Sequence, residues 1–175
     1  MIEIRFHGRA GQGAKTAAQT LAVAALKENQ FVQAFPNFGP ARRGAPVQAF
    51  VRLDTTSIYL HSQIYQPDFV VVLEKSLVEV DNAFEGTKPE TKVLVNAPQP
   101  IPKALSIDAS RIAQHFLGKN LPNLVMVGAL LKVMGNVIDL KTIEATIAEE
   151  LEAKVGSQVV EKNILALRQG YQEIL

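Results

Sequence analysis

The residues best suited to bind a ligand form a glycine-rich segment near the N-terminus, GRAGQGAKT, from Gly8 to Thr16. Glycines at positions 8, 11 and 13 allow positive φ angles and let a ligand approach the backbone without a Cβ in the way. A helix that begins after such a turn presents unpaired N–H groups, which suit a phosphate, and Arg9 and Lys15 add full charges. The spacing G-x-x-G-x-G matches neither the dinucleotide fingerprint nor the P-loop, so a turn without a ligand stays an alternative.

The second candidate is the arginine pair Arg42-Arg43, which follows an expected strand at 30–35. In NAD-binding Rossmann domains the end of the second strand usually supplies an acid to the ribose, but no acidic residue lies between Glu28 and Asp54. Guanidinium groups instead suit a phosphomonoester, as on coenzyme A or NADP. A solvated basic loop, or a salt bridge to another subunit, would explain the same residues.

No reaction centre accompanies these two segments. The three histidines, His7, His61 and His115, are scattered, and no pair has helical i, i+4 spacing, so a histidine-built metal site is not expected. His7 ends a predicted strand and is expected to be a hydrogen-bonded structural residue. The absence of cysteine excludes thiolate nucleophiles, disulfides and cysteine-ligated clusters within this chain. The sequence therefore predicts a binding site with no catalytic residue and no metal.

The elements that position these segments are those of an α/β protein. Alternation predicts a strand over 2–7, and a face of small residues predicts a helix over 12–27. Further strands are expected at 30–35, 45–54, 67–74, 91–97 and, more weakly, 104–110, with 57–62 returning on 45–54 as a hairpin. The continuous apolar runs at 67–74 and 91–97 are typical of strands buried in a parallel sheet.

The last third of the chain is expected to be helical. A buried helix over 123–135 should end at Gly135, Asp139 should cap the next helix, and 160–174 should be amphipathic. A length of 175 residues suits one domain. We expect a single domain over 1–175, a layered α/β sandwich with a mixed, mostly parallel sheet, a Rossmann-like first βα unit and a helical C-terminal third.

Composition and charge limit the partners. The chain is 47% hydrophobic and 20% charged, enough to form a core. No uncharged run reaches the roughly 18 apolar residues of a membrane span, and the N-terminus lacks the apolar stretch of a secretory signal, so a cytoplasmic protein without membrane contact is expected. Residues 1–53 carry seven Lys/Arg and two acids, against eleven and fifteen in 54–175. This favours one anionic ligand site over a nucleic-acid-binding stripe.

Five segments, in this order, resemble the gamma subunit of pyruvate:ferredoxin oxidoreductase. They are GRAGQGAKTAAQTLA, QAFPNFGPARRGAPVQAFVR, IYQPDFVVVLEKSLV, NLVMVGALLKVMG and KNILALRQGY. The resemblance covers essentially the whole chain, and the glycine turn together with FG-x-x-RRGAPV is its most specific part. Gamma subunits for other 2-oxoacids share the turn and the arginine-glycine, so the resemblance points to the family more firmly than to the oxoacid.

The resemblance implies a complex of anaerobic metabolism that converts a 2-oxoacid and coenzyme A to acyl-CoA, carbon dioxide and reduced ferredoxin or flavodoxin. Thiamine diphosphate, Mg²⁺ and [4Fe-4S] clusters would lie on alpha, beta and delta partner subunits, which agrees with the absence of cysteine here. Coenzyme A would contact this chain. Its pyrophosphate would be lined by Arg9, Gly11, Gln12, Gly13 and Thr16, and its adenosine phosphate by Arg42 and Arg43. Two departures from the family pattern are Ala10, often a glycine, and Ala41, commonly a glutamate.

Two other functions stay open at this point. The chain could be a structural interaction subunit, with no ligand of its own, in a complex that acts on 2-oxoisovalerate or 2-oxoglutarate. It could also be a free-standing NADP-binding domain, but that function needs a reaction centre that the sequence does not provide.

Overall fold

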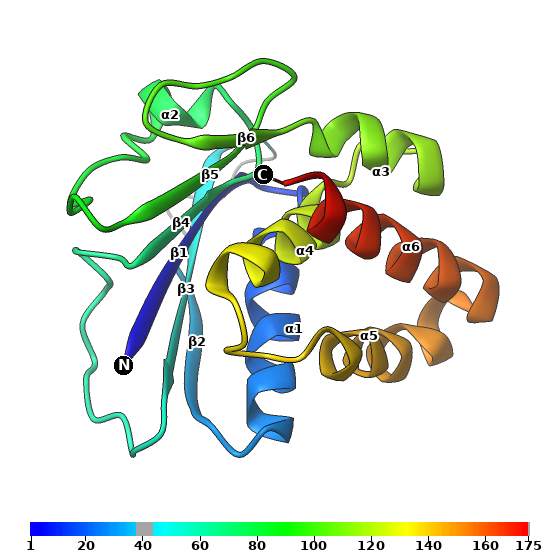
Figure 1. The fold of residues 1–175 in the computed structure, drawn as a ribbon, viewed down its shortest axis with the longest axis horizontal. Helices are drawn as coiled ribbons and strands as arrows, with labels where there is room; N and C mark the ends of the chain where they lie inside the picture. The colour runs from blue at the N-terminus through cyan, green and yellow to red at the C-terminus, as the bar shows by residue number, and fades with distance from the viewer. Residues whose placement is uncertain (38–43, 175) are drawn as a thin grey trace.

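The computed structural model describes residues 1–37 and 44–174, which form one six-stranded sheet with helices stacked mainly on one face (Figure 1). The strands are β1 (Ile2–Arg9), β2 (Phe31–Asn37), β3 (Pro46–Asp54), β4 (Phe69–Val72), β5 (Lys92–Asn96) and β6 (Leu105–Ile107). The helices are α1 (Ala14–Lys27), α2 (Leu77–Val80), α3 (Ala109–Leu117), α4 (Asn123–Met134), α5 (Leu140–Val155) and α6 (Ser157–Glu173). The predicted α/β fold with a helical last third is confirmed.

The sheet is mixed, with strand order β2-β3-β1-β4-β5-β6. The pairs β1–β4, β4–β5 and β5–β6 are parallel, and β1–β3 and β2–β3 are antiparallel. The strand after α1 therefore lies at the edge of the sheet rather than beside β1, so the Rossmann-like part is limited to β1, its turn and α1. Because β1 and β4 are parallel neighbours, the loops that follow them emerge at the same edge of the sheet.

The expected hairpin between 45–54 and 57–62 is wrong. β3 already pairs with β1 on one side and with β2 on the other, so no free edge remains for a third strand. Residues 57–62 instead run as a loop, held by the Gln33 side chain, whose Nε2 donates to the carbonyl oxygens of Ile58 (3.3 Å) and Leu60 (2.9 Å). The antiparallel partner of β3 at this edge is β2.

The weak strand expected at 104–110 is only partly right. β6 stops at Ile107, and α3, a helix that the sequence did not predict, follows it. Asp108 caps this helix, because its Oδ1 accepts a hydrogen bond from the backbone N–H of Arg111 (2.9 Å). This is an ordinary N-cap, and α3 then ends at Gly118, which has a left-handed φ of 68°.

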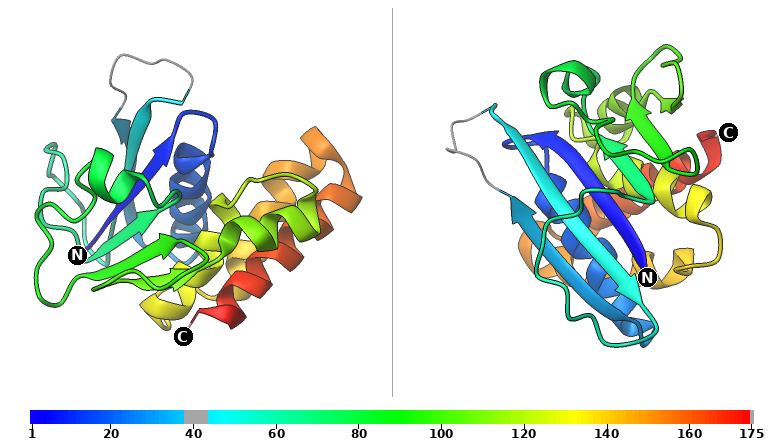
Figure 2. Two further views of the ribbon diagram at one scale, coloured as in Figure 1. Left: turned by 90° about the horizontal axis from the view of Figure 1, so that it is seen from above. Right: turned by 90° about the vertical axis from the view of Figure 1, so that its left-hand side faces the viewer.

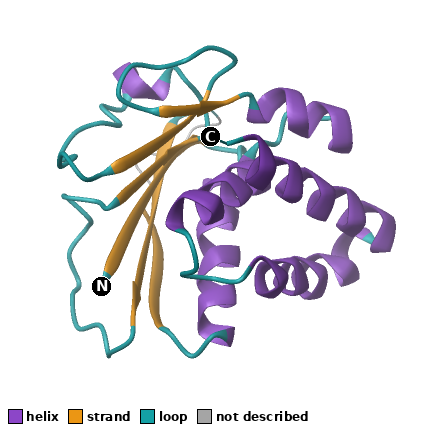
Figure 3. Cartoon of the chain, in the orientation of Figure 1, coloured by secondary structure: helices purple, strands orange, loops and turns teal. Residues whose placement is uncertain are grey.

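The sheet has one face under helices and one under loops. The first of these, which we call the helical face, packs against α1, α4 and their neighbours (Figure 3). The opposite face, the loop face, is covered by α2 and by long connections (Figure 2). Its smaller apolar cluster centres on Val70, Val72 and Leu77. Alanines line the sheet side of α1, which lets this helix lie close to β2 and β3.

The C-terminal helices are held by close backbone contact. A Cβ on Gly128 of α4 would lie 2.0 Å from the carbonyl oxygen of Leu167 in α6, and one on Gly170 would lie 2.1 Å from that of Val125. The predictions for this region are confirmed: α4 is buried almost all round and ends at Gly135, and Asp139 caps α5 by accepting from Lys141 N (2.7 Å). Among the described helices none is long and apolar enough to cross a membrane.

Candidate functional site

The glycine turn joins the end of β1 to the start of α1. Gly11 and Gly13 have φ angles of 100° and 81°, which other residues rarely adopt. Among the described residues no side chain caps the N-terminus of α1, so the first-turn N–H groups depend on partners outside the helix. These groups border a hollow of about 350 Å³. It is lined by Arg9, Ala10, Gly11, Gly13, Ala14, Lys15, Thr16 and Val47.

Asn123, the first residue of α4, explains why position 13 needs a glycine beyond its φ angle. A Cβ there would lie 2.5 Å from Asn123 Nδ2. Asn123 is 3% exposed, and its Oδ1 has no hydrogen-bond partner among the described residues. The sequence alone did not single out Asn123, because no motif around it indicates a contact with the glycine turn more than a hundred residues earlier.

Arg9 links three loops at this edge of the sheet. Its Nε donates to Glu74 Oε2 (2.7 Å), its Nη2 to Ser76 Oγ (2.8 Å) and its Nη1 to the Gly44 carbonyl (3.0 Å). A guanidinium has more N–H donors than these three contacts use. Arg9 is therefore first a positioning residue, and only its remaining donors can reach a ligand.

Gln12 and Glu74 complete this network. Gln12 accepts from the Arg9 backbone N–H (2.8 Å) and donates to Glu74 Oε2 (3.1 Å), while Ser76 donates to Glu74 Oε1. Burial opposes the charge of Glu74, but the hydrogen bond from Ser76 and the charge of Arg9 lower the pKa of this carboxyl below its ordinary value. A carboxylate therefore balances Arg9. Sequence reasoning missed Glu74 and Ser76, although both directly follow a buried strand.

The chain that leaves the arginine pair returns to the glycine turn. Arg42 and Arg43 lie outside the described residues, but Gly44 and Ala45, which follow them, are placed. Ala10 N donates to the Ala45 carbonyl (2.9 Å), beside the contact between Arg9 and the Gly44 carbonyl. Gly44 and Ala45, which follow the arginine pair in the sequence, therefore lie beside the glycine turn at one edge of the sheet.

The basic excess of residues 1–53 is partly structural. Arg52 is 1% exposed and donates to Glu3 Oε1 (2.8 Å), and Arg5 is 6% exposed and donates to the carbonyl oxygens of Ala83 and Glu85. These two cations lie on the loop face and are matched there by oxygen acceptors. Lys15, in contrast, is exposed beside the turn. The charge asymmetry thus gives weaker support to an anion site than the sequence suggested.

His7 has the structural position that the sequence predicted. It is 1% exposed, and its Nδ1 lies 2.5 Å from Asp81 Oδ2, which also accepts from Gln48 Nε2 (3.2 Å). Burial lowers the pKa of His7 more strongly than the hydrogen bond to Asp81 raises it. Burial therefore favours the neutral imidazole, and His7 does not line the hollow at the glycine turn.

Comparison with known proteins identifies the family. The family model described as pyruvate ferredoxin/flavodoxin oxidoreductase matches residues 3–173. The chain is 45% identical to pyruvate synthase subunit PorC of Methanocaldococcus jannaschii, with 100% of this chain and 98% of that protein covered. The crystal structure of pyruvate oxidoreductase subunit PORC from Thermotoga maritima matches with a TM-score of 0.87 at 37% identity, covering 99% and 97% of the two chains.

A more distant likeness extends to a larger enzyme. The 2-oxoglutarate:ferredoxin oxidoreductase from Magnetococcus marinus, solved with 2-oxoglutarate, coenzyme A and succinyl-CoA bound, matches with a TM-score of 0.81 at 21% identity. The match covers 97% of this chain and 30% of that one, so the same fold occurs there within a longer chain. With a family match over nearly its full length and relatives above 30% identity, this chain belongs to the pyruvate ferredoxin/flavodoxin oxidoreductase family and corresponds to its gamma subunit.

Proposed function

We propose that this chain serves a pyruvate:ferredoxin oxidoreductase by holding coenzyme A at the glycine turn. The observation that carries the proposal is the meeting of two segments: Gly44 and Ala45, which directly follow the arginine pair, are hydrogen-bonded to Arg9 and Ala10 of the turn. In this proposal a phosphorylated ligand at the turn would also be contacted by Arg42 and Arg43, which directly precede Gly44 in the sequence. The relatives named pyruvate synthase support pyruvate as the oxoacid.

Each group at the turn has a distinct role in this proposal. The uncapped N–H groups of α1 and the hydroxyl of Thr16 would donate to the pyrophosphate of coenzyme A, and Lys15 would add a charge. Gly11 and Gly13 keep the backbone open to the phosphates. Arg42 and Arg43 would hold the adenosine phosphate bidentately. Arg9 and Gln12 would mainly keep the turn in place through Glu74.

The contribution of this chain to the reaction would be proximity. The overall reaction converts pyruvate and coenzyme A to acetyl-CoA and carbon dioxide, with two electrons passed to ferredoxin or flavodoxin. Thiamine diphosphate with Mg²⁺ on a partner subunit would supply the decarboxylation chemistry, and [4Fe-4S] clusters on partners would carry the electrons. Holding the thiol against a separately bound centre raises its effective concentration, so modest affinity suffices for a large effect on rate. The proposal includes a cytoplasmic location of the complex and its assembly from this chain with alpha, beta and delta subunits.

The arginine pair provides the test. In the reconstituted complex, R42A/R43A should raise the KM for coenzyme A with little change of kcat, because each lost charge-assisted contact is worth roughly 1.5–3 kcal/mol. The matched control K92A/K141A also removes two cations, at exposed positions away from the turn, and should leave the KM unchanged. If the kinetic constants for coenzyme A are unchanged in R42A/R43A, the two arginines do not bind the coenzyme.

A purely structural role is the second candidate, and the commitment of Arg9 to Glu74, Ser76 and Gly44 favours it. Titrating coenzyme A into the intact complex by calorimetry separates the two functions. If coenzyme A binding is unaffected by R42A/R43A and by K15A/T16A, the glycine turn has only a structural role and the coenzyme binds elsewhere in the complex. Tight binding of NADP by the purified chain would instead favour a free-standing nucleotide-binding domain.

A further inference from the structure

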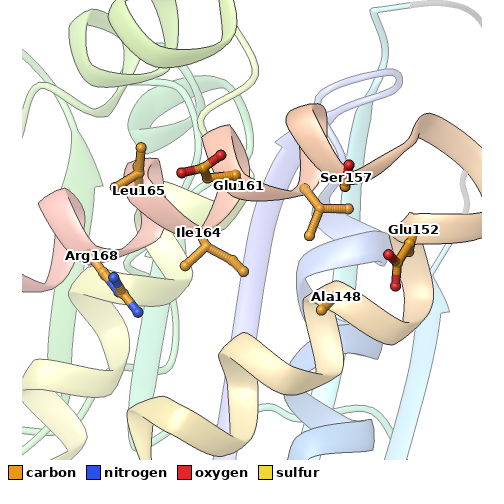
Figure 4. A pocket seen from close by; sticks show the side chains of 8 residues that line it. Ala148, Glu152, Ser157, Glu161, Ile164, Leu165 and Arg168 are labelled. Carbon is orange, nitrogen blue, oxygen red and sulfur yellow. The ribbon is translucent and has the colours of Figure 1, made fainter.

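The hairpin formed by α5 and α6 carries a groove that no other part of the described chain fills. The two helices are joined at Gly156, which has a φ of 79° and lies between the end of α5 and the start of α6. The groove between them encloses about 410 Å³ (Figure 4). Its lining consists of Ala148, Glu152, Ser157, Val160, Glu161, Ile164, Leu165 and Arg168.

The apolar packing of this hairpin is incomplete at its tip. The buried residues of α5, Ile143, Thr146 and Ile147, all lie in its first half, and none occurs from 148 to 155. The second half of α6, in contrast, packs against α4 through Gly128 and Gly170. Near the tip, Val155 and Val159 are 45% and 38% exposed, and Leu165, which lines the groove, is 39% exposed. A rigid base therefore presents an apolar tip that lacks a partner within the described residues.

The charges that border the groove are unbalanced. Arg168 is already neutralised, since its Nε and Nη2 donate to the two carboxylate oxygens of Glu144 at 2.6 and 2.7 Å. Glu152 and Glu161 have no ion pair among the described residues. The groove thus combines apolar walls with two carboxylates that lack a cation.

These charges also argue against a second copy of the chain as the occupant. A two-fold interface places the same patch of each copy against the other. Pairing through this groove would bring the carboxylates of Glu152 and Glu161 from both copies together, and like charges in an interface are unfavourable. The complementary occupant is an amphipathic helix with an apolar ridge and basic flanks.

We propose that the α5–α6 groove docks a helix of another subunit of the oxidoreductase complex, which places apolar side chains between the two helices and Lys or Arg beside Glu152 and Glu161. The proposal rests on the chain's being one subunit of a complex, as the proposed function has it. It does not depend on where coenzyme A binds, because the groove and the glycine turn share no residue.

Assembly of the complex tests the proposal. L165D places a charge among the apolar walls, and E152K/E161K reverses the two carboxylates; each should weaken binding to the remaining subunits roughly tenfold or more in a titration by light scattering or calorimetry. E79K/E90K is the matched control, because it reverses two exposed carboxylates outside the groove, and it should assemble like the unaltered chain. Circular dichroism of each purified variant shows whether it is folded, and A148D, at another residue that lines the groove, provides a second test of the apolar walls if L165D is not folded.

The outcomes separate this proposal from its rivals. Wild-type assembly of all the folded variants would overturn it. If L165D fails to assemble but E152K/E161K binds like the unaltered chain, the partner helix does not carry Lys or Arg beside these two carboxylates, and that part of the proposal is wrong. Self-association of the isolated chain that L165D abolishes would assign the groove to a second copy instead. If the groove variants alter the KM for coenzyme A but assemble normally, the groove affects coenzyme binding and does not dock a partner helix.

Discussion

The two faces of β1 are buried to the same extent but by different chemistry. Ile4 and Phe6 point to the helical face and are 0% exposed, while Arg5 and His7 point to the loop face and are 6% and 1% exposed. Helices cover a sheet with apolar side chains because their own backbone groups are satisfied internally. Loops have carbonyl groups to spare, and here those of Ile64, Ala83 and Glu85 accept hydrogen bonds from Arg5. Polar residues are therefore buried under these loops with most of their hydrogen bonds made, while Arg5 Nε and His7 Nε2 have no partner among the described residues.

The largest effect is expected on the helical face. Phe6→Ala should lower the free energy of unfolding by about 3–5 kcal/mol, because it removes a fully buried ring and leaves a cavity beneath the helices. Urea unfolding followed by circular dichroism gives the value. Val80→Ala, at a position 64% exposed, should change it by less than about 0.5 kcal/mol. Equal losses from both variants would mean that the helices do not seal this face.

On the loop face, the corresponding prediction concerns the buried ion pair between Arg52 and Glu3. Arg52→Met should cost about 3 kcal/mol, because it leaves Glu3 without its cation and the Gln63 carbonyl and Gln33 Oε1 without their donor. A double-mutant cycle with Glu3→Gln measures the coupling, which should lie between about 0.5 and 3 kcal/mol. Additive effects in the cycle would show that Arg52 acts through Gln33, Gln63 and the Phe35 ring, whose centre lies 5.7 Å away, rather than through Glu3.

This contrast marks the limit of prediction from the sequence. The alternation in residues 2–7 correctly predicted a strand with two unlike faces, but the same pattern is given by a strand whose polar side faces solvent. Burial of Arg5 and Arg52 depends on loops that cross the sheet from positions 63–66 and 83–86, and periodicity carries no information about where a loop travels. The hairpin at 57–62 failed for the same reason, since strand order decides which edges of β3 are free.

The candidate site was predictable to a similar degree. The glycine turn is local, so its residues and its place before α1 could be expected from the sequence. Glu74 and Ser76 act on Arg9 from a distance of more than sixty residues, and they come into contact only because β1 and β4 are parallel neighbours. Asn123 reaches Gly13 from a fourth segment. Such contacts follow from the topology of the sheet, which no short motif encodes.

The smallest effect, and the one that best separates the faces, depends on pH. Burial holds the pKa of His7 below its ordinary value of 6.5, against the opposing hydrogen bond to Asp81. The unfolded chain then binds the proton more readily than the folded one. Stability from this group is therefore present above about pH 6.5 and declines as the pH falls below it, by at most about 1.4 kcal/mol per pH unit.

His7→Gln should accordingly flatten the dependence of the unfolding free energy on pH between about 7.5 and 5.5, where the unaltered chain should become less stable as the pH falls. Asp81→Asn should act in the opposite sense: without the carboxylate the imidazolium is disfavoured further, so the decline should continue to lower pH. Asp81 itself titrates below this window, since its interactions with His7 and Gln48 outweigh burial and lower its pKa. Phe6→Ala should shift the whole curve without changing its slope, because the helical face at this strand contains no group that titrates. An unchanged slope in His7→Gln would mean that polar burial under the loops leaves the imidazole as easily protonated as in the unfolded chain.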